Sequence, residues 1–316
     1  MNLKGTVIKT TGSWHSVQLD DQTMCDCRVR GKFRIKGIRN TNPIAVGDRV
    51  FVERSPNEET GVIVDMEKRR NYIIRKATKL SKEAHIIASN IDTVFVVASL
   101  VSPETSLMLI DRILVSAEAY RINAVILINK SDMLSADKLE LADAYKYIYE
   151  TIGYKVLLIS ATTGQNIDQV RALMKNKTSV FVGMSGVGKS TLINYLEPGL
   201  QIKTGEISDA HLQGKHTTTF AEMHTLSFGG YIIDTPGIRS FGLLEMDKKE
   251  ELSHYFPEIF KISDQCRFNN CTHTHEPGCA VREAVEENSI PFTRYENYLA
   301  IMQGDEDEKY RKDLYG

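Results

Sequence analysis

A glycine-rich stretch between a short apolar run and a helical pattern constrains this chain more than any other feature. Residues 181–194 read FVGMSGVGKSTLIN, which fits the pattern G-x-x-x-x-G-K-[ST]. The run Ser179–Val182 before the glycines predicts a buried strand, and Thr191–Leu196 predicts the first turns of a helix. This strand–loop–helix order predicts a phosphate-binding loop in an α/β fold.

The residues of this loop have distinct expected roles. Lys189 would contact the β- and γ-phosphates and support catalysis, and the Ser190 hydroxyl would bind Mg²⁺. We expect the whole loop to contact nucleotide, namely Gly183, Met184, Ser185, Gly186, Val187, Gly188, Lys189, Ser190 and Thr191. A glycine-rich turn without a ligand is the alternative, which Lys-Ser at this offset disfavours. The loop indicates a nucleoside triphosphate but does not name the base.

Composition limits the class of protein. A chain of 316 residues predicts two or three domains. It is 42% apolar and 25% charged, which is typical of soluble globular proteins. Its net charge of −2 means that any nucleic-acid surface must be local. The N-terminus shows no apolar signal core, and the run Thr93–Val101 is far shorter than a membrane span. We therefore expect a cytoplasmic protein. We also expect a monomer, although the sequence itself leaves the oligomeric state open.

Residues 1–68 show short alternating runs and no long helical period, which predicts a small β-barrel or sandwich. In the expected strand Arg28–Lys36 every even position is basic: Arg28, Arg30, Lys32, Arg34 and Lys36. Because strand side chains alternate between faces, five positive charges would line one face. Cys25 and Cys27 share the odd register and are expected in the core. We predict an oligonucleotide-binding (OB-like) barrel that contacts RNA phosphates, with a merely solvated face as the alternative.

From about residue 86, strand and helix patterns alternate, which predicts a largely parallel sheet covered on both faces. Residues 66–85 are basic without a clear period and are expected to form a linker. The expected strands are Thr93–Leu100, Ala124–Ile128, Lys155–Ile159, Ser179–Val182, Phe220–Ser227 and Gly230–Ile233. The expected helices are Thr105–Tyr120, Ala136–Ile152 and Asn166–Lys175. We assign residues 69–240 to this domain and residues 241–316, with further helical patterns, to a third.

Residues 129–132, Asn-Lys-Ser-Asp, follow a predicted parallel strand, and doubly wound folds bind ligands at the carboxyl ends of such strands. The Asp132 carboxylate only accepts hydrogen bonds. Guanine offers an N1–H and an exocyclic amine on one edge, whereas adenine offers no such pair. Lys130 would pack along the base, Asn129 would bind the phosphate loop, and Ser131 completes the motif. The motif therefore predicts guanine as the base.

Two more loops follow predicted strands. The loop after strand 155–159 consists of Ser160, Ala161 and Thr162. It resembles the short loop with which GTPases contact the guanine carbonyl through a backbone amide. Residues 234–237 read Asp-Thr-Pro-Gly, a D-x-x-G motif. Asp234 would hold Mg²⁺ through water, and the Gly237 N–H would meet the γ-phosphate.

The polar segment 203–219 between the phosphate loop and the D-x-x-G motif is expected to be a switch. A hydroxyl of Thr217, Thr218 or Thr219 would complete the Mg²⁺ shell; we favour Thr218, against a threonine-rich loop that only solvates itself. Many GTPases place a glutamine after D-x-x-G to orient the attacking water, but Ile238 stands here. Unaided hydrolysis is expected to be slow. His216 is the nearest catalytic substitute, and a solvent-exposed histidine is the alternative.

Three of the five cysteines fall within residues 266–279. Cys266, Cys271 and Cys279 with one histidine would supply a Cys₃His set, which suits tetrahedral Zn²⁺. Four protein ligands close the metal shell, so the expected site is structural. The spacing leaves both His273 and His275 open as the fourth ligand.

The five GTPase motifs occur in a rotated order: NKSD, SAT, GMSGVGKS, HTTT and DTPG. With a basic β-domain before them and a Cys/His cluster after them, the chain resembles the circularly permuted ribosome-assembly GTPases of the RsgA/YjeQ family over essentially its whole length. The family pattern Cys-x-His selects His273. SAT in place of the commoner SAK is a departure that affects a mainly backbone contact.

The resemblance implies a GTPase that acts late in maturation of the small (30S) ribosomal subunit. It implies stimulation by the subunit, binding of 16S rRNA, association with the assembly factor RbfA, and release on hydrolysis. GTP and GDP, Mg²⁺ and one structural Zn²⁺ are the implied ligands. A nucleotide-gated RNA-binding scaffold with incidental turnover is the rival that Ile238 supports. A P-loop kinase that uses ATP is disfavoured by NKSD.

Overall fold

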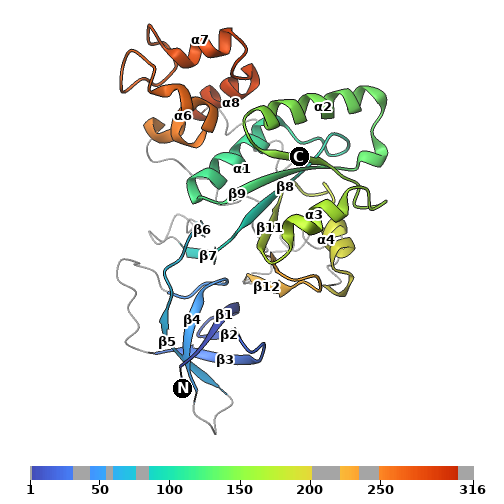
Figure 1. Cartoon of the computed structure of the whole chain (residues 1–316), viewed down its shortest axis with the longest axis vertical. Coiled ribbons are helices and arrows are strands. Elements are labelled where there is room, and N and C mark those ends of the chain that lie inside the picture. The colour runs from blue at the N-terminus through green and yellow to red at the C-terminus, as the bar shows by residue number, and fades with distance from the viewer. Residues whose placement is uncertain are drawn as a thin grey trace, which may run out of the picture. The chain divides into compact units, whose positions relative to one another are not determined.

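The computed structural model describes residues 2–30, 43–54, 60–75, 85–200, 221–234 and 249–304. Figure 1 shows the chain coloured from the N-terminus to the C-terminus. The chain forms two compact units whose segments alternate along the sequence. The first comprises residues 1–94, 167–181 and 190–242, and the second comprises residues 95–166, 182–189 and 243–316. The sequence-based boundaries at 68/69 and 240/241 follow motifs rather than packing and stay predictions.

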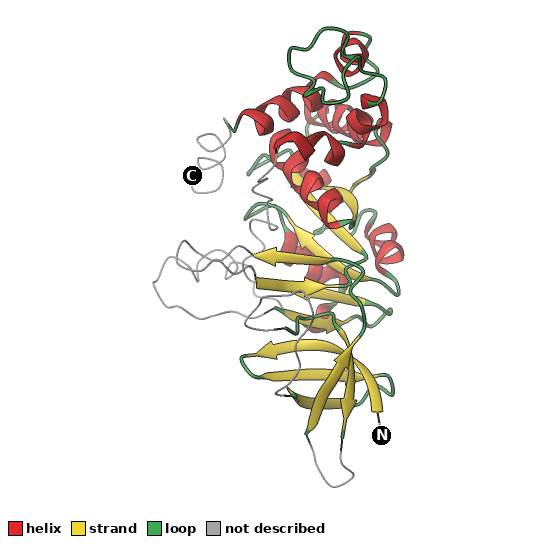
Figure 2. Cartoon of the chain, turned by 90° about the vertical axis from the view of Figure 1, so that its left-hand side faces the viewer, coloured by secondary structure: helices red, strands yellow, loops and turns green. Residues whose placement is uncertain are grey.

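Five strands of the first unit close an N-terminal barrel (Figure 2). The strands are β1 (Asn2–Thr11), β2 (Trp14–Leu19), β3 (Met24–Val29), β4 (Arg49–Glu53) and β5 (Gly61–Met66). β1 pairs with both β2 and β4, and β5 joins β3 to β4, which closes the ring. Alternate residues of β2 and β4 are buried, as expected for strands that turn one face to the core and the other to solvent. The predicted barrel is confirmed, with Cys25 and Cys27 in its core.

The expected linker at residues 66–85 is partly wrong. β6 (Tyr72–Arg75) pairs antiparallel with β7 (His85–Ser89). Ile73 is fully buried in this ribbon, so its apolar side chain, rather than the surrounding basic residues, decides the local structure.

The remaining strands of the first unit extend from the barrel. β12 (Glu222–Thr225) pairs antiparallel with β1 and with β13 (Tyr231–Asp234), and β13 pairs parallel with β11 (Thr178–Val182). The helical elements here are α3 (Ile167–Met174), the 3₁₀ turn η2 (Pro198–Leu200) and α4 (Lys189–Leu196), whose first residue belongs to the second unit. The predicted strand, loop and helix order around residues 179–196 is confirmed.

The second unit holds the strands that carry the predicted base-binding loops. β8 (Thr93–Ser99), which begins in the first unit, β9 (Asn123–Asn129) and β10 (Lys155–Leu158) lie in the order β10–β9–β8, and β9 and β10 are parallel. All seven residues of β8 are buried, so the strand needs apolar side chains on both faces. The helical elements of this part are α1 (Leu107–Tyr120), η1 (Ser131–Met133) and α2 (Ala136–Thr151).

The C-terminal part is mainly helical, as predicted. It contains η4 (Lys249–Tyr255), α6 (Pro257–Ser263), α7 (Ala280–Glu286) and α8 (Phe292–Gln303). Their apolar side chains pack with Val115 of α1 in one core. α8 was not predicted from the sequence, although Pro291 before it and Gly304 in the left-handed region after it are ordinary helix-boundary residues. No helix in the described ranges is long and apolar enough to cross a membrane.

Candidate nucleotide site and metal centre

Asn129, the last residue of β9, joins three loops. Its side-chain amide donates to the Val187 carbonyl oxygen at 2.8 Å. Its Oδ1 accepts from the backbone N–H of Ala161 at 3.0 Å. The residue is buried, so both hydrogen bonds lie away from water, where a missing partner is costly. The three sequence motifs NKSD, SAT and GMSGVGKS therefore meet at one asparagine.

Asp132 lies in η1, the short 3₁₀ helix that follows Asn129 and Lys130. The Ser160 hydroxyl donates to its Oδ1 at 2.6 Å, which fixes one oxygen and leaves acceptor positions on the carboxylate. Lys130 adopts a left-handed backbone, and its Nζ donates to the Ser102 carbonyl at 2.7 Å. Partial burial lowers the pKa of the Lys130 ammonium, and the Asp132 charge opposes that shift. The Asp132 carboxylate and the Lys130 side chain thus belong to the same short loop after β9.

Two glycines of the phosphate loop have no room for a side chain. A Cβ on Gly183 would lie 2.1 Å from the Val97 carbonyl oxygen, and a Cβ on Gly188 would lie 2.4 Å from the Asn129 amide nitrogen. The φ angle of Gly188 is +98°, which L-residues rarely adopt. The loop therefore requires glycine both for its turn and for its contact with the base-binding loop.

Lys189 begins α4 and its ammonium is held against the loop. Nζ donates to the carbonyl oxygens of Gly183 and Met184 at 2.8 Å and 2.5 Å. Ser190 and Thr191 follow in the first turn of α4, where backbone N–H groups have no partner within the helix. The placement of a cation and a hydroxyl at this turn fits a bound triphosphate with Mg²⁺.

The other predicted nucleotide residues divide between described and undescribed parts of the chain. Asp234 ends β13, directly opposite Glu222 of β12. Thr162 is exposed in the turn that follows Ala161. His216, Thr218 and Gly237 lie outside the described residues, as do Thr217, Thr219 and Ile238.

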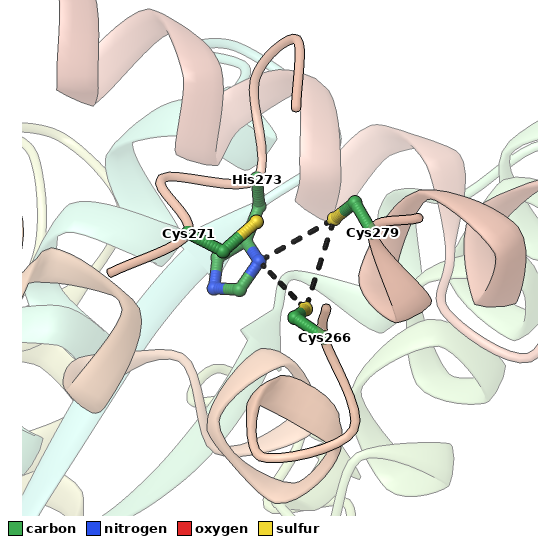
Figure 3. A group of neighbouring side chains, drawn as sticks. All are labelled: Cys266, Cys271, His273 and Cys279. Atoms are coloured by element: carbon green, nitrogen blue, oxygen red, sulfur yellow. Dashed lines mark hydrogen bonds between the residues drawn. The ribbon is translucent and has the colours of Figure 1, made fainter. Parts of the chain in front are cut away.

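Cys266, Cys271, His273 and Cys279 form one compact cluster (Figure 3). Their ligand atoms all lie within 4.8 Å of one another. The sulfurs of Cys266 and Cys279 are 3.9 Å apart, and each is 3.5 Å from His273 Nδ1. A tetrahedral Zn²⁺ with Zn–S bonds of about 2.3 Å would hold sulfurs about 3.8 Å apart and each sulfur about 3.5 Å from a nitrogen ligand. The donor set and its spacing therefore fit Zn²⁺.

Burial and hydrogen bonding set the ionisation of the cluster and the place of its histidine. Burial, with the neighbouring thiols, raises the pKa of Cys271 to about 12, and a bound Zn²⁺ would favour the thiolate form that ligates metal. His273 has a left-handed backbone (φ +60°) and is buried, and Tyr295 donates to its carbonyl at 2.6 Å. His275 is exposed instead. The structure thus brings together the predicted ligands with His273 as the fourth.

The Glu276 carboxylate shapes the loop that carries His273. It accepts from the backbone N–H groups of Thr272 at 2.8 Å and Thr274 at 3.0 Å. Burial opposes ionisation of this group, but the Thr272 hydrogen bonds hold its pKa well below the ordinary value. Hydrogen bonds to Glu276 therefore stabilise the loop that carries His273, in addition to any bound metal.

The basic strand differs from the prediction. β3 begins at Met24 and ends at Val29, so Arg28 lies in it and Arg30 lies just beyond it. Both side chains are exposed, but the Arg30 guanidinium forms an ion pair with Glu53 of β4. Arg28 stacks on the Trp14 ring, 4.2 Å from its centroid. Lys32, Arg34 and Lys36 lie outside the described residues, so the full basic face stays a prediction.

Comparison with known proteins decides the family. A model of the RsgA GTPase family matches residues 66–244, and a model of the RsgA N-terminal domain matches residues 4–63. The chain belongs to the RsgA GTPase family. It is accordingly a GTP-hydrolysing enzyme, and GTP, GDP and Mg²⁺ are the ligands of that activity.

Similarity to relatives of the RsgA family extends over the whole chain. A protein of Bacteroides fragilis named small ribosomal subunit biogenesis GTPase RsgA is 52% identical over 98% of this chain and 99% of its own. A Flavobacterium psychrophilum protein of the same name is 50% identical over 99% and 96%. The crystal structure of YjeQ from Thermotoga maritima matches with a TM-score of 0.79 and 34% identity, over 96% of this chain and 98% of that one. YloQ, described as a circularly permuted GTPase, matches with a TM-score of 0.77, 32% identity and coverage of 97% and 96%. The permuted GTPase fold inferred from motif order is therefore confirmed.

The structure adds contact residues that the RsgA motifs do not include. The segment after β8 supplies the Ser102 carbonyl to Lys130, and a Cβ on Gly186 would lie 3.2 Å from Pro103. Gln165 accepts from the Ser131 hydroxyl at 2.8 Å. The Ser-Pro turn at the carboxyl end of a predicted strand was a usable signal for the first segment. Gln165 carried no signal in the sequence.

Proposed function

We propose that the loops joined by Asn129 bind the guanine base and phosphates of GTP. The observation that carries this proposal is the pair of hydrogen bonds from Asn129 to Val187 and Ala161. Asp132, oriented by Ser160, would accept from the N1–H and amine of guanine. Residues 183–191 would surround the phosphates, with Lys189 as the neutralising charge.

The proposed metal and catalytic residues are Ser190, Thr218 and Asp234 for Mg²⁺ and Lys189 and His216 for hydrolysis. Bound Mg²⁺ would neutralise developing charge on the phosphates. Ser190 would hold it directly and Asp234 through water, while Lys189 stabilises negative charge on the γ-phosphate. His216 would orient the attacking water in place of the glutamine that Ile238 replaces. The Cys₃His cluster would hold one structural Zn²⁺ and stabilise the C-terminal helices.

The relatives' names extend the proposal to a biological role. Because proteins about half identical over the full chain are named small ribosomal subunit biogenesis GTPases, we propose that this enzyme acts in late 30S maturation. The barrel would contact 16S rRNA through its basic positions, and the subunit would stimulate hydrolysis. A cytoplasmic monomer that associates with RbfA fits this role. We assign RNA binding to residues 1–68, nucleotide hydrolysis to 69–240 and zinc binding to 241–316.

A single-turnover GTP hydrolysis assay with and without purified small subunits tests the proposal. Slow intrinsic turnover and a large acceleration by subunits are the expected results. Subunit binding that depends on GTP but leaves turnover unchanged would instead support the nucleotide-gated scaffold. Large ribosomal subunits at the same concentration are the matched control for a general polyanion effect.

A further inference from the structure

One row of residues crosses from the barrel to the D-x-x-G motif. Lys9 of β1 lies opposite Glu222 of β12, and Glu222 lies opposite Asp234 of β13. Paired strands are about 4.8 Å apart, so two steps place the barrel residue about 10 Å from the backbone of Asp234. The barrel is thus joined by sheet pairing to the strand that ends at a proposed Mg²⁺ residue.

β1 changes partner along its length. Residues 2–6 pair with β4 and close the barrel, whereas Lys9 pairs with β12. The register against β2 shifts between Val7 and Lys9, which marks a bulge. A bulge bends a strand and redirects its side chains. This bulge therefore lies between the part of β1 that pairs with β4 and Lys9, which pairs with β12, while β1 stays paired with β2 as far as Thr11.

Side chains reinforce the backbone pairing at both ends of β13. Lys9 Nζ lies 2.9 Å from Glu222 Oε2, in an ion pair whose side chains are about 40% exposed. The Tyr231 hydroxyl donates to Gln18 Oε1 of β2 at 3.2 Å. Tyr231 begins β13 and Asp234 ends it, so barrel residues contact the hairpin near both limits.

The hairpin β12–β13 separates the two segments that the proposed mechanism uses. Glu222 follows the switch threonine Thr218 by four residues, and Asp234 opens D-x-x-G. Antiparallel pairing from Glu222–Asp234 to Thr225–Tyr231 joins the two strands in one hydrogen-bonded hairpin. A shift of this hairpin would therefore move the attachments of both segments together.

We propose that Lys9 and Glu222 are positioning residues that couple polyanion binding on the barrel to the γ-phosphate segments. This inference rests on the proposed function, because it requires hydrolysis that a bound small subunit stimulates. Neither residue contacts nucleotide in the proposed mechanism. Their part is to keep β12 in register with β1, so that force or rotation imposed on the barrel reaches the switch and D-x-x-G segments.

The test is a charge-swap series measured with saturating small subunits. Lys9→Glu and Glu222→Lys each place like charges together, and the double variant restores the pair with the charges exchanged. Each single variant should lower subunit-stimulated kcat about fivefold or more, the lower range of energetic coupling between sites. The double variant should recover most of it. Intrinsic turnover of Lys9→Glu and the subunit concentration for half-maximal stimulation should stay near wild type.

The chain offers a matched control for this series. Lys4 on the same strand pairs with Glu67 at similar exposure, 40% for each side chain, whereas the residue of β1 that the structure pairs with β12 is Lys9. Lys4→Glu and Glu67→Lys should leave stimulation unchanged. Tyr231→Phe, which removes only the hydrogen bond to Gln18, should give a smaller loss than the charge reversals and guards against misfolding of the others.

The outcomes separate the two proposals. If small subunits stimulate GTP hydrolysis by the wild-type protein and by all the variants to the same extent, the coupling is overturned and the proposed function stands. Loss of subunit affinity in Lys9→Glu that the double variant does not recover would make Lys9 a phosphate contact, which also overturns the coupling. Absence of stimulation in the wild-type protein would contradict the proposed function itself, and the coupling with it.

Discussion

Arg294 Nη1 of α8 lies 2.6 Å from Asp111 Oδ1 of α1, and both side chains are buried. Arg294 Nε also donates to Glu258 of α6 at 2.7 Å. Asn297 and Tyr149 donate to the Asp111 carboxylate at 2.6 Å and 2.8 Å. Burial and the Asp111 charge raise the pKa of Tyr149 well above its ordinary value, so its hydroxyl stays a donor. One arginine therefore neutralises two buried carboxylates that join the C-terminal helices to α1.

Arg294→Ala should reduce the free energy of unfolding by about 3–5 kcal/mol, because Asp111 and Glu258 would remain buried without their cation. Urea denaturation followed by circular dichroism measures the change. Lys4→Ala, which breaks a half-exposed pair with Glu67, should cost less than about 1 kcal/mol. Equal small losses in the two variants would show that the buried pair contributes no more than a surface pair.

Lys189→Ala should weaken triphosphate binding by at least tenfold, because the loop loses the cation that would face the phosphates. Ser190→Ala should retain binding better but impair Mg²⁺-dependent turnover. Titration with a fluorescent GTP analogue and a phosphate-release assay measure the two effects. Lys175→Ala, an exposed lysine beyond α3, is the control and should behave as wild type. Normal turnover in Lys189→Ala would contradict the phosphate-loop assignment.

Zinc content should equal one ion per chain by elemental analysis. Cys271→Ser and His273→Ala should each lose the metal and loosen the C-terminal helices, while GTP binding largely persists. His275→Ala is the matched control, since this exposed histidine lies outside the cluster and its loss should leave zinc bound. Native protein without metal, or zinc that survives His273→Ala but not His275→Ala, would contradict the ligand set.

The basic positions of the barrel should contact phosphates rather than bases. Replacing Arg30, Lys32 and Arg34 by Ser should weaken subunit binding and lower its salt slope by roughly 0.7–0.9 for each lost phosphate contact. Because the structure pairs Arg30 with Glu53, its share is expected to be the smallest of the three. Replacing Lys146, Lys155 and Lys175 by Ser is a control with equal charge loss. Unchanged affinity for subunits and an unchanged salt slope would show that the basic side chains face solvent and do not contact phosphates.

Sequence motifs predicted that the NKSD, SAT and GMSGVGKS loops lie together, because each of these loops comes at the end of a strand of the sheet. Asn129 ends β9, and the SAT loop follows β10, so their positions at one sheet edge follow from the parallel pairing of those strands. The Cys₃His cluster was predictable for a different reason. Three cysteines and one histidine close together in the sequence are a donor set typical of tetrahedral Zn²⁺.

Contacts between segments that are far apart in the sequence could not be predicted in this way. Nothing local marks Asp111 as the partner of Arg294, because burial of a charge depends on which helices pack together. The pairing of Lys9 with Glu222, 213 residues later, likewise depends on how β1 extends beyond the residues that pair with β4. The end of β3 at Val29 and the ion pair of Arg30 with Glu53 were not predictable either, because alternation alone does not show where a strand ends or which residue lies beside it.

Asp132→Asn, assayed with GTP and with xanthosine triphosphate in the presence of small subunits, tests the central claim most directly. The amide can donate to the C2 carbonyl of xanthine, whereas the native carboxylate is repelled by it and accepts from guanine. The variant should lose subunit-stimulated hydrolysis of GTP and gain it with xanthosine triphosphate, while wild type shows the reverse. Stimulated hydrolysis of GTP at the wild-type rate and affinity in Asp132→Asn would contradict the proposed guanine site.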